Sequence, residues 1–396
     1  MKKLAAVLLM LFVLLSFAGA QLVIWSSENQ IPALEKLAAD FESDYGIQVE
    51  IQQVNFGDIK PKFLTAAPAG EGPDIIVGAH DWVGELALNG LIEPIPFLPD
   101  SDQYYEVALD AFSYGGKLYG VPYTIEAIAI IYNKDLVFEE PKTISELEEL
   151  ALEASDDEVV GLIYTAGDFY HSAPFILGRG GYIFKETADG LDVTDIGLNN
   201  EGAIAGGKLI KSWFDKGLIP AGPNYNLMDS LFKDGLAAFI VNGIWATPGY
   251  RDAGIDYAIL PFSEITFDDG TTPRPFVGVQ GFMINAKSKN KLEATEFVVN
   301  YIGSFEGQYG MFLGERRGTA RADVFSFIEA NAGPELYDVL QFSKSASVGT
   351  PMPNVPEMAS VWGAMADALG LIINGQDTVE NAFNSAVEKI KTSIGN

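Results

Sequence analysis

The stretch LVIWSSE at residues 22–28 begins a region in which strand and helix patterns alternate as far as residue 93. Residues 31–43 carry apolar side chains at the spacing of a helix face, and residues 47–52 alternate between apolar and polar as a half-buried strand does. The expected elements are strands at 22–25, 47–52, 74–78 and 91–93, and helices at 31–43, 58–67 and 81–89, the last capped by Asp81. Repeated strand–helix units predict an α/β fold with a parallel sheet covered by helices.

The residues that follow the first three strands are the first candidates for a binding site. In parallel sheets of this kind, ligands bind beyond the carboxyl ends of the strands. The residues at those ends are Trp25, Ser26, Ser27, Glu28, Asn55, Phe56, Gly78, Ala79, His80, Asp81 and Trp82. The set contains no Lys or Arg, which disfavours a phosphate or carboxylate ligand and favours a neutral, hydroxyl-rich one.

The rest of the chain continues in the same α/β style. The expected elements are a hairpin turn at Gly115-Gly116, an extended run at 125–132, a helix opened by the capping box at 143–146, a helix at 199–217, a strand at 237–242 followed by Trp245, an extended run at 276–285, and helices at 291–302, 357–374 and 378–391. The chain contains no internal repeat and no low-complexity linker. Two domains without a linker are expected to exchange chain through strands and to be discontinuous in sequence.

Composition supports two packed domains and excludes several partners. A single hydrophobic core stops growing near ~250–300 residues, and this chain has 396 residues, of which 48% are hydrophobic. With 54 acidic and 25 basic side chains the net charge is −29, which repels nucleic acids and anionic membranes. The chain has no cysteine, so disulfides, thiolate metal sites and a lipid-bearing N-terminal cysteine are excluded.

The first twenty residues resemble a cleavable signal peptide. Lys2 and Lys3 precede an apolar run that ends at Phe17, and residues 18–20, Ala-Gly-Ala, form the small-x-small pattern of a cleavage site. The run is shorter than the ~20 residues of a membrane-spanning helix. We therefore expect cleavage after Ala20 and a soluble periplasmic protein that is not lipid-anchored and works as a monomer.

Motifs of common enzymes are missing from the sequence. The two histidines, His80 and His171, do not form an H-E-x-x-H motif, and neither G-x-S-x-G nor a phosphate-binding P-loop occurs. We therefore expect no metal site, no cofactor and no catalytic residues. Two of the many carboxylates would suffice for a glycoside hydrolase, so that alternative stays open.

Several short motifs resemble those of bacterial maltose/maltodextrin-binding proteins. The motifs are GPDII at 72–76, AHD at 79–81, GKL at 116–118, YNKD at 132–135, GGY at 180–182, NGIW at 242–245, PFVGV at 275–279 and MPNVP at 352–356. They cover essentially the whole chain after the leader. The PFVGV and MPNVP segments are the more particular to the maltodextrin branch, and residues 78–84 are most similar to its thermotogal members.

The resemblance implies a two-lobed periplasmic-binding-protein fold of the α/β class, with a mixed sheet flanked by helices in each lobe. It places the N-terminal lobe at 21–124 plus 283–326, the C-terminal lobe at 129–276 plus 332–396, and hinge crossovers near 124–128, 276–283 and 317–332. It implies capture of maltose, maltotriose or longer maltodextrins between the lobes and delivery to a membrane ABC permease. The alternatives are a binding protein for trehalose or a β-glucan, and a secreted glycoside hydrolase.

The resemblance also assigns ligand contacts residue by residue. The implied contacts are Trp245 and Trp362 as stacking rings, and Asp81, Glu126, Asp168, Tyr170 and Glu28 as polar partners of the sugar. Other roles are open for some of them. Trp245 and Trp362 are also suited to core packing, Asp81 to a helix cap and Glu28 to a solvated loop. Glu126 stands in an apolar run, where a buried carboxylate needs partners.

Four positions depart from the family pattern. Gly78 occupies the position of the family's first-lobe tryptophan, and Trp82 replaces an arginine four residues later, so stacking is expected to have moved to Trp82. Gly363 and Ala366 replace a tyrosine and an arginine of the family. These changes leave the preferred ligand length open, with maltotriose as an alternative to maltose.

Overall fold

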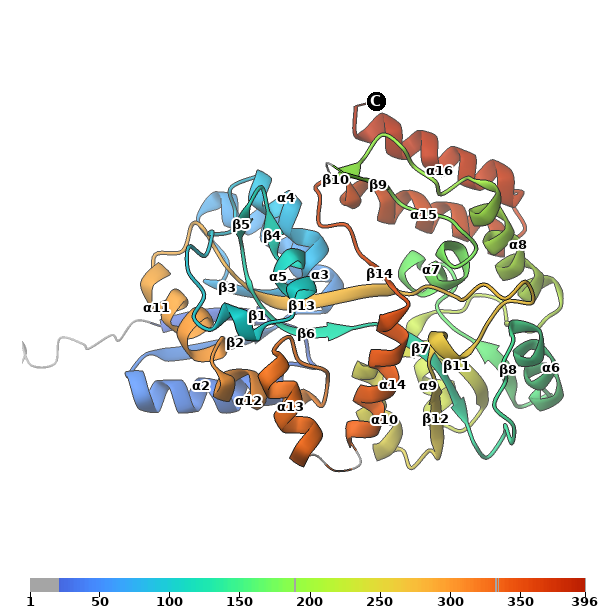
Figure 1. Cartoon of the computed structure of the whole chain (residues 1–396), viewed down its shortest axis with the longest axis horizontal. Coiled ribbons are helices and arrows are strands. Elements are labelled where there is room, and N and C mark those ends of the chain that lie inside the picture. The colour runs from blue at the N-terminus through green and yellow to red at the C-terminus, as the bar shows by residue number, and fades with distance from the viewer. Residues whose placement is uncertain (1–20, 189, 332, 334, 396) are drawn as a thin grey trace, which may run out of the picture.

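The computed structural model describes residues 21–188, 190–331, 333 and 335–395, so the predicted signal peptide lies outside the described residues. Within that part the chain forms two large β-sheets, each flanked by helices, and two two-stranded sheets, and the predicted two-lobed α/β class is confirmed (Figure 1). No described helix is both long and apolar enough to cross a membrane.

The first sheet has the strand order β14-β13-β3-β1-β2, and β6 pairs with β13. Its strands are β1 Gln21–Ser26, β2 Gln48–Gln53, β3 Ile75–Ala79, β6 Val121–Glu126, β13 Phe276–Ile284 and β14 Thr350–Pro351. The helices beside it are α2 Ile31–Tyr45, α3 Phe56–Ala66, α4 Val83–Leu88, α5 Glu106–Ala111, α11 Lys291–Thr295, α12 Phe305–Glu315 and α13 Ala322–Asn331. Strands β1, β2 and β3 are parallel, as predicted, so their carboxyl ends meet at one edge.

The second sheet has the strand order β12-β7-β11-β8. Its strands are β7 Ile128–Asn133, β8 Val160–Ile163, β11 Ala237–Gly243 and β12 Tyr257–Leu260. The helices beside it are α6 Ile144–Ala154, α7 Phe169–Leu177, α8 Glu201–Asp215, α9 Tyr225–Lys233, α10 Thr247–Asp252, α14 Glu335–Ser347, α15 Met358–Ile373 and α16 Val379–Ser393. Each sheet has its own hydrophobic core, formed around Phe41, Ile76 and Phe282 in the first and around Ile131, Trp213 and Phe239 in the second.

Two strands link the sheets. The extended run predicted at 125–132 is interrupted at Ala127, where the chain leaves β6 in the first sheet and enters β7 in the second. Figure 1 shows β6 and β13 running side by side from the left half of the molecule toward the right half. Along β13, Phe276 packs in the second core and Phe282 in the first. These strands therefore give the molecule a continuous backbone connection between two separate cores.

Three predicted elements are wrong in detail. Residues 91–93 form only an isolated bridge, between Ile92 and Asn285, and not a full strand. Asp81 does not cap a helix, since it lies inside a 3₁₀ turn, His80–Trp82, that leads into α4. The helix expected at 291–302 changes from α11 to a π-helix, Glu296–Ile302, which apolar periodicity alone does not reveal.

Small hairpins complete the fold. Gly115 and Gly116 have φ of +56° and +75° and join β4 Ser113–Tyr114 to β5 Lys117–Leu118, so the predicted turn is confirmed. A second hairpin, β9 Lys185–Thr187 and β10 Gly190–Asp192, projects from the second lobe.

The segment at 352–356 is held against the first sheet and its helices. The side-chain amide of Asn354 donates to the backbone oxygens of Asp110, Ala111 and Ser113, at 2.7 to 3.0 Å. Gly84 of α4 lies under this segment, because a Cβ added there would sit 2.8 Å from the backbone nitrogen of Pro356. Close approach of two backbones therefore requires glycine at position 84.

Gly84→Ala should lower the free energy of unfolding by about 1–3 kcal/mol, because its methyl group overlaps backbone atoms that cannot move aside cheaply. Gly370→Ala in α15 is the matched control, since nothing lies within 4 Å of a Cβ there. That change should stabilise the protein by about 0.5–1 kcal/mol through helix propensity. Urea unfolding of both variants measures the difference, and a Gly84→Ala protein as stable as the unsubstituted chain would contradict the close approach.

Candidate functional site

Trp82 lies against the carboxyl end of β3. A Cβ added at Gly78 would overlap the six-membered ring of Trp82, so this ring occupies the space that a larger side chain at position 78 would need. Phe56, which follows β2, packs beside it with ring centroids 5.2 Å apart. Phe56 and Trp82, which follow strands on either side of β1, therefore lie together at one edge of the first sheet.

Trp245 has the same relation to the second sheet. It follows β11, and its six-membered ring lies where a Cβ of Gly243 would be. Its indole nitrogen donates to the hydroxyl of Tyr225 at 3.2 Å, which fixes the orientation of the half-buried ring. Each sheet thus presents one tryptophan that rests on a glycine at the end of a strand.

Asp81 and Trp362 join the two lobes. The indole nitrogen of Trp362, on α15, donates to the Asp81 carboxylate at 3.0 Å. The helix-cap alternative for Asp81 is wrong, because Trp82 is the N-cap residue of α4 and no side chain caps that helix. Burial raises the pKa of Asp81, against the neighbouring charges of His80 and Lys60. Trp362 also packs on Phe169, with ring centroids 6.0 Å apart, so it combines core packing with a polar contact.

Tyr170 lies among three of the predicted acidic residues. Burial raises the pKa of its hydroxyl well above the usual value, and the charges of Glu126, Asp168 and Asp81 add to that effect. A Cβ added at Gly278 of β13 would be 3.5 Å from the Tyr170 hydroxyl and 3.7 Å from Cγ of Glu126. Glycine at this position therefore leaves space between the tyrosine and the carboxylate.

Asp168 and Glu28 have contacts of other kinds. Asp168 accepts the backbone N–H of Tyr170 at 3.2 Å as the cap of α7, and it lies 2.6 Å from Nδ1 of His171. Glu28 is exposed in the turn after β1, and no described contact joins its side chain to the other predicted site residues. The structure thus brings Asp81, Glu126, Asp168 and Tyr170 together and leaves Glu28 apart.

Sequence reasoning missed a set of buried polar residues behind Glu126. The Glu126 carboxylate accepts from the amide of Gln280 at 2.7 Å and lies 3.4 Å from Nη1 of Arg317. Arg317 also contacts Glu315, with Nε 3.2 Å from its carboxylate. The one signal in the sequence was the acid at position 126 within an apolar run, which requires a partner but does not identify it.

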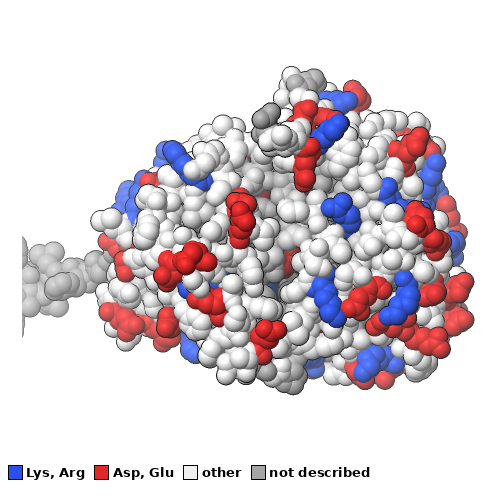
Figure 2. Space-filling model, viewed as in Figure 1, with Lys and Arg blue, Asp and Glu red and all other residues white. Residues whose placement is uncertain are grey.

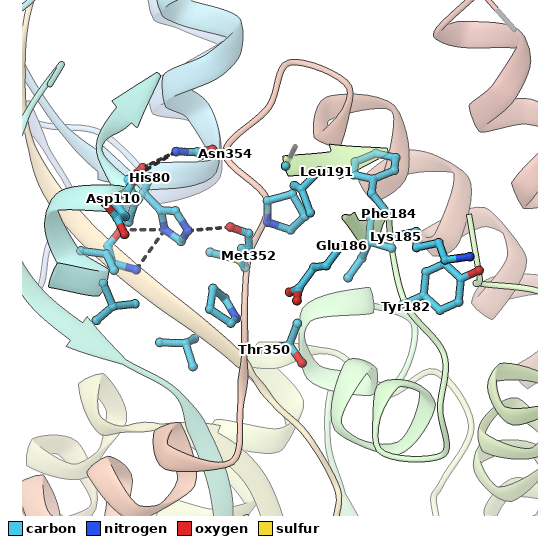
Figure 3. A pocket seen from close by; sticks show the side chains of 18 of the residues that line it. His80, Asp110, Tyr182, Phe184, Lys185, Glu186, Leu191, Thr350, Met352 and Asn354 are labelled. Carbon is cyan, nitrogen blue, oxygen red and sulfur yellow. Dashed lines mark hydrogen bonds between the residues drawn. The ribbon is translucent and has the colours of Figure 1, made fainter. Parts of the chain in front are cut away.

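A groove of about 990 Å³ lies elsewhere between the lobes. Figure 3 shows its walls, with His80 and Asn354 on one side and the β9–β10 hairpin, including Phe184 and Leu191, on the other. The ring of His80 is buried there between the backbone of Val279 and the carbonyl of Met352. None of the eight predicted site residues lines this groove.

Basic side chains do not gather into a patch on the face of the molecule drawn in Figure 2. Acidic and basic side chains are interspersed over the face drawn in Figure 2. Among the described residues, no three potential ligand side chains from His, Asp or Glu gather as a metal site would require. The cluster of rings, acids and amides described above therefore remains the candidate site.

Comparisons with known proteins show which proteins this chain is similar to. The structure of the Thermus thermophilus maltotriose binding protein, bound with maltotriose, superposes with a TM-score of 0.87 and is 34% identical, covering 94% of this chain and 100% of that one. The maltotriose-binding protein of Pyrococcus abyssi is 30% identical over 90% of this chain and 78% of its own length. The galactooligosaccharide-binding protein of Bacillus subtilis is 28% identical over 96% and 90%.

The chain also matches the model of a protein family. The model of the bacterial extracellular solute-binding proteins matches residues 36–336. Because that match spans more than half of the chain, the protein belongs to the bacterial extracellular solute-binding protein family.

Proposed function

We propose that this protein captures maltooligosaccharides of about the length of maltotriose between its lobes and hands them to a membrane ABC permease. The observation that carries the proposal is the pair of tryptophans, Trp82 and Trp245, each resting on a glycine at a strand end of its own sheet. Two rings from two lobes suit a ligand with several apolar faces. The relatives named for maltotriose and galactooligosaccharides support an oligosaccharide of this size.

The other residues match the hydroxyl edges of such a ligand. Sugars present apolar C–H faces that stack on aromatic rings and hydroxyls that both donate and accept. Carboxylates at Asp81, Glu126 and Asp168 accept from hydroxyls, and the Tyr170 hydroxyl does both. Trp362 adds a third ring beside Asp81. In this proposal the strand ends bind the sugar, and Glu28 reaches it only at the edge.

Lobe closure and export complete the proposal. The lobes are taken as 21–124 plus 283–326 and 129–276 plus 332–396, with hinges near 124–128, 276–283 and 317–332. In this proposal the protein is exported to the periplasm by cleavage after Ala20 and is not lipid-anchored, since the sequence has no cysteine to carry a lipid. The receptor is proposed to work as a monomer. It needs no cofactor or metal and performs no catalysis.

Titration with maltotriose should change the intrinsic tryptophan fluorescence, because three of the five tryptophans lie at the proposed site. Trp245→Ala should weaken binding by about 2–4 kcal/mol, the scale for a buried aromatic anchor. Calorimetry with maltose, maltotriose, trehalose and a galactooligosaccharide ranks the ligands. If the folded protein binds no maltodextrin, the proposed function is contradicted. If trehalose or the galactooligosaccharide binds more tightly than the maltodextrins, that sugar replaces them as the proposed ligand.

Gly78→Ala and Gly243→Ala should each weaken maltotriose binding by about tenfold or more, equivalent to ~1.4 kcal/mol, because the added methyl displaces the ring that rests there. Gly57→Ala in α3 is the control, since nothing lies within 4 Å of a Cβ at that position. Dissociation constants from fluorescence titration, with melting temperatures as a folding check, report the effect. Unchanged affinity in Gly78→Ala would remove Trp82 from the site.

Incubation with maltoheptaose should return the sugar intact, which separates a receptor from a glycoside hydrolase. A reducing-end assay over hours, with a glucosidase as positive control, measures any cleavage. If the protein steadily releases new reducing ends and the Glu126→Gln variant does not, the protein is a glycoside hydrolase and the proposed receptor function is wrong.

A further inference from the structure

Arg317 contacts both the hinge and a stacking ring. It follows α12, its side chain is only 3% exposed, and its guanidinium lies between Glu126 of β6 and Glu315. Its Cζ is also 5.9 Å from the ring centroid of Trp245, within the range of a cation–π contact. The Arg317 side chain thus contacts both Glu126, on a strand that links the sheets, and Trp245, at the end of a strand of the second sheet.

Hydrogen bonds extend this contact to the first strand of the fold. Gln280 of β13, which donates to Glu126, accepts in turn from the amide of Gln30 at 3.1 Å and from the Tyr123 hydroxyl at 3.4 Å. The Gln30 oxygen accepts from the hydroxyl of Ser26 at 3.1 Å. A continuous polar chain therefore runs through the buried interior from the end of β1 to Arg317, and Arg317 connects it to Trp245.

Among these hydrogen-bonded residues, the acidic side chains outnumber the basic ones. Two carboxylates, Glu126 and Glu315, face one guanidinium. One oxygen of Glu315 is buried without a hydrogen-bond partner. Burial raises the pKa of Glu315 from its usual 4.5 to about 8; the charge of Arg317 opposes this rise and that of Glu126 adds to it. Tyr123 is the remaining titratable group that faces it. At neutral pH Glu315 therefore keeps its proton, and Arg317 is left to pair with Glu126.

We propose that Arg317 is the positioning residue of the sugar site. Its guanidinium fixes both the direction of the Glu126 carboxylate and the orientation of the Trp245 ring. The inference rests on the proposed function. The planar guanidinium is required because it presents several donors in a fixed fork and a flat face, whereas lysine offers one compact charge on a flexible stem. The neutral Glu315 holds the Nε edge of the guanidinium without competing for its charge.

Arg317→Lys keeps the charge and removes the fork, so it tests position rather than neutralisation. We expect maltotriose affinity to fall by about tenfold, the scale of one misplaced charged hydrogen bond, and the fluorescence of the sugar-free protein to change as Trp245 loses its neighbour. Arg316→Lys, the same change at the adjacent arginine, should alter neither. Affinity and emission in Arg317→Lys equal to those of Arg316→Lys, with both proteins folded, would overturn the proposal.

The pH profile supplies a second readout. Above about pH 8 Glu315 ionises and competes with Glu126 for Arg317, so the affinity for maltotriose should decline between pH 7 and 9. Glu315→Gln should flatten that decline. In the unfolded chain Glu315 ionises near 4.5, so the folded protein holds the extra proton and loses stability relative to Glu315→Gln as pH rises from 4.5 to about 8. Parallel urea unfolding at several pH values measures this difference.

The outcomes separate this inference from the proposed function. If the unsubstituted protein binds no oligosaccharide, the proposed function fails and the inference fails with it. If it binds maltotriose, but Glu315→Gln keeps the same pH decline or the stability difference does not grow with pH, only the role given to Arg317 and Glu315 is overturned.

Discussion

The antiparallel pairing of β6 with β13 is the interaction on which the rest of this structure depends. These strands connect the two sheets, and their register places Glu126 opposite Gly278 and Thr124 opposite Gln280. Residues directly opposite each other in such a pair project from the same face, so Glu126 and Gln280 become diagonal neighbours that hydrogen-bond. A shift of this register by one residue would turn Glu126 to the other face of the sheet. The pairing of β6 with β13 therefore both connects the lobes and sets the position of the Glu126 carboxylate.

The glycines at the strand ends have a comparable role within each sheet. Gly78 and Gly243 have no side chain, which allows an indole ring to lie directly on the backbone. Trp82 is buried and Trp245 is half-buried. A ring held in place in this way loses little further freedom when a ligand contacts it, so less of the binding free energy is lost to ordering the side chain. The same local solution appears in both lobes, although the tryptophan follows its glycine by four residues in one and by two in the other.

Local patterns in the sequence predicted the parallel sheet and the residues that follow its strands, because periodicity and capping are properties of neighbouring residues. The contact of Phe56 with Trp82 follows from that topology, because β2 and β3 lie on either side of β1 and run parallel to it. The break at Ala127 was not predictable, because residues 125–132 are apolar on both sides of it apart from Glu126, which does not mark a change of sheet. Arg317 was missed for a different reason, since its partner Glu126 lies 191 residues away and no local signal links the two.

The buried charges of Glu126, Glu315 and Arg317 are better explained by the directions that they fix than by stability. Removing an ion pair from water is expensive, and a buried pair is on average no more stabilising than well-packed apolar side chains of similar volume. Apolar side chains at 126 and 317 would fill the same space without any preferred direction. A guanidinium and a carboxylate accept only a few geometries, and Gln280 and Glu315 narrow these further. Between two lobes that share only a few strands, such directional contacts define where the acid and the ring lie relative to each other, which a hydrophobic contact alone does not do.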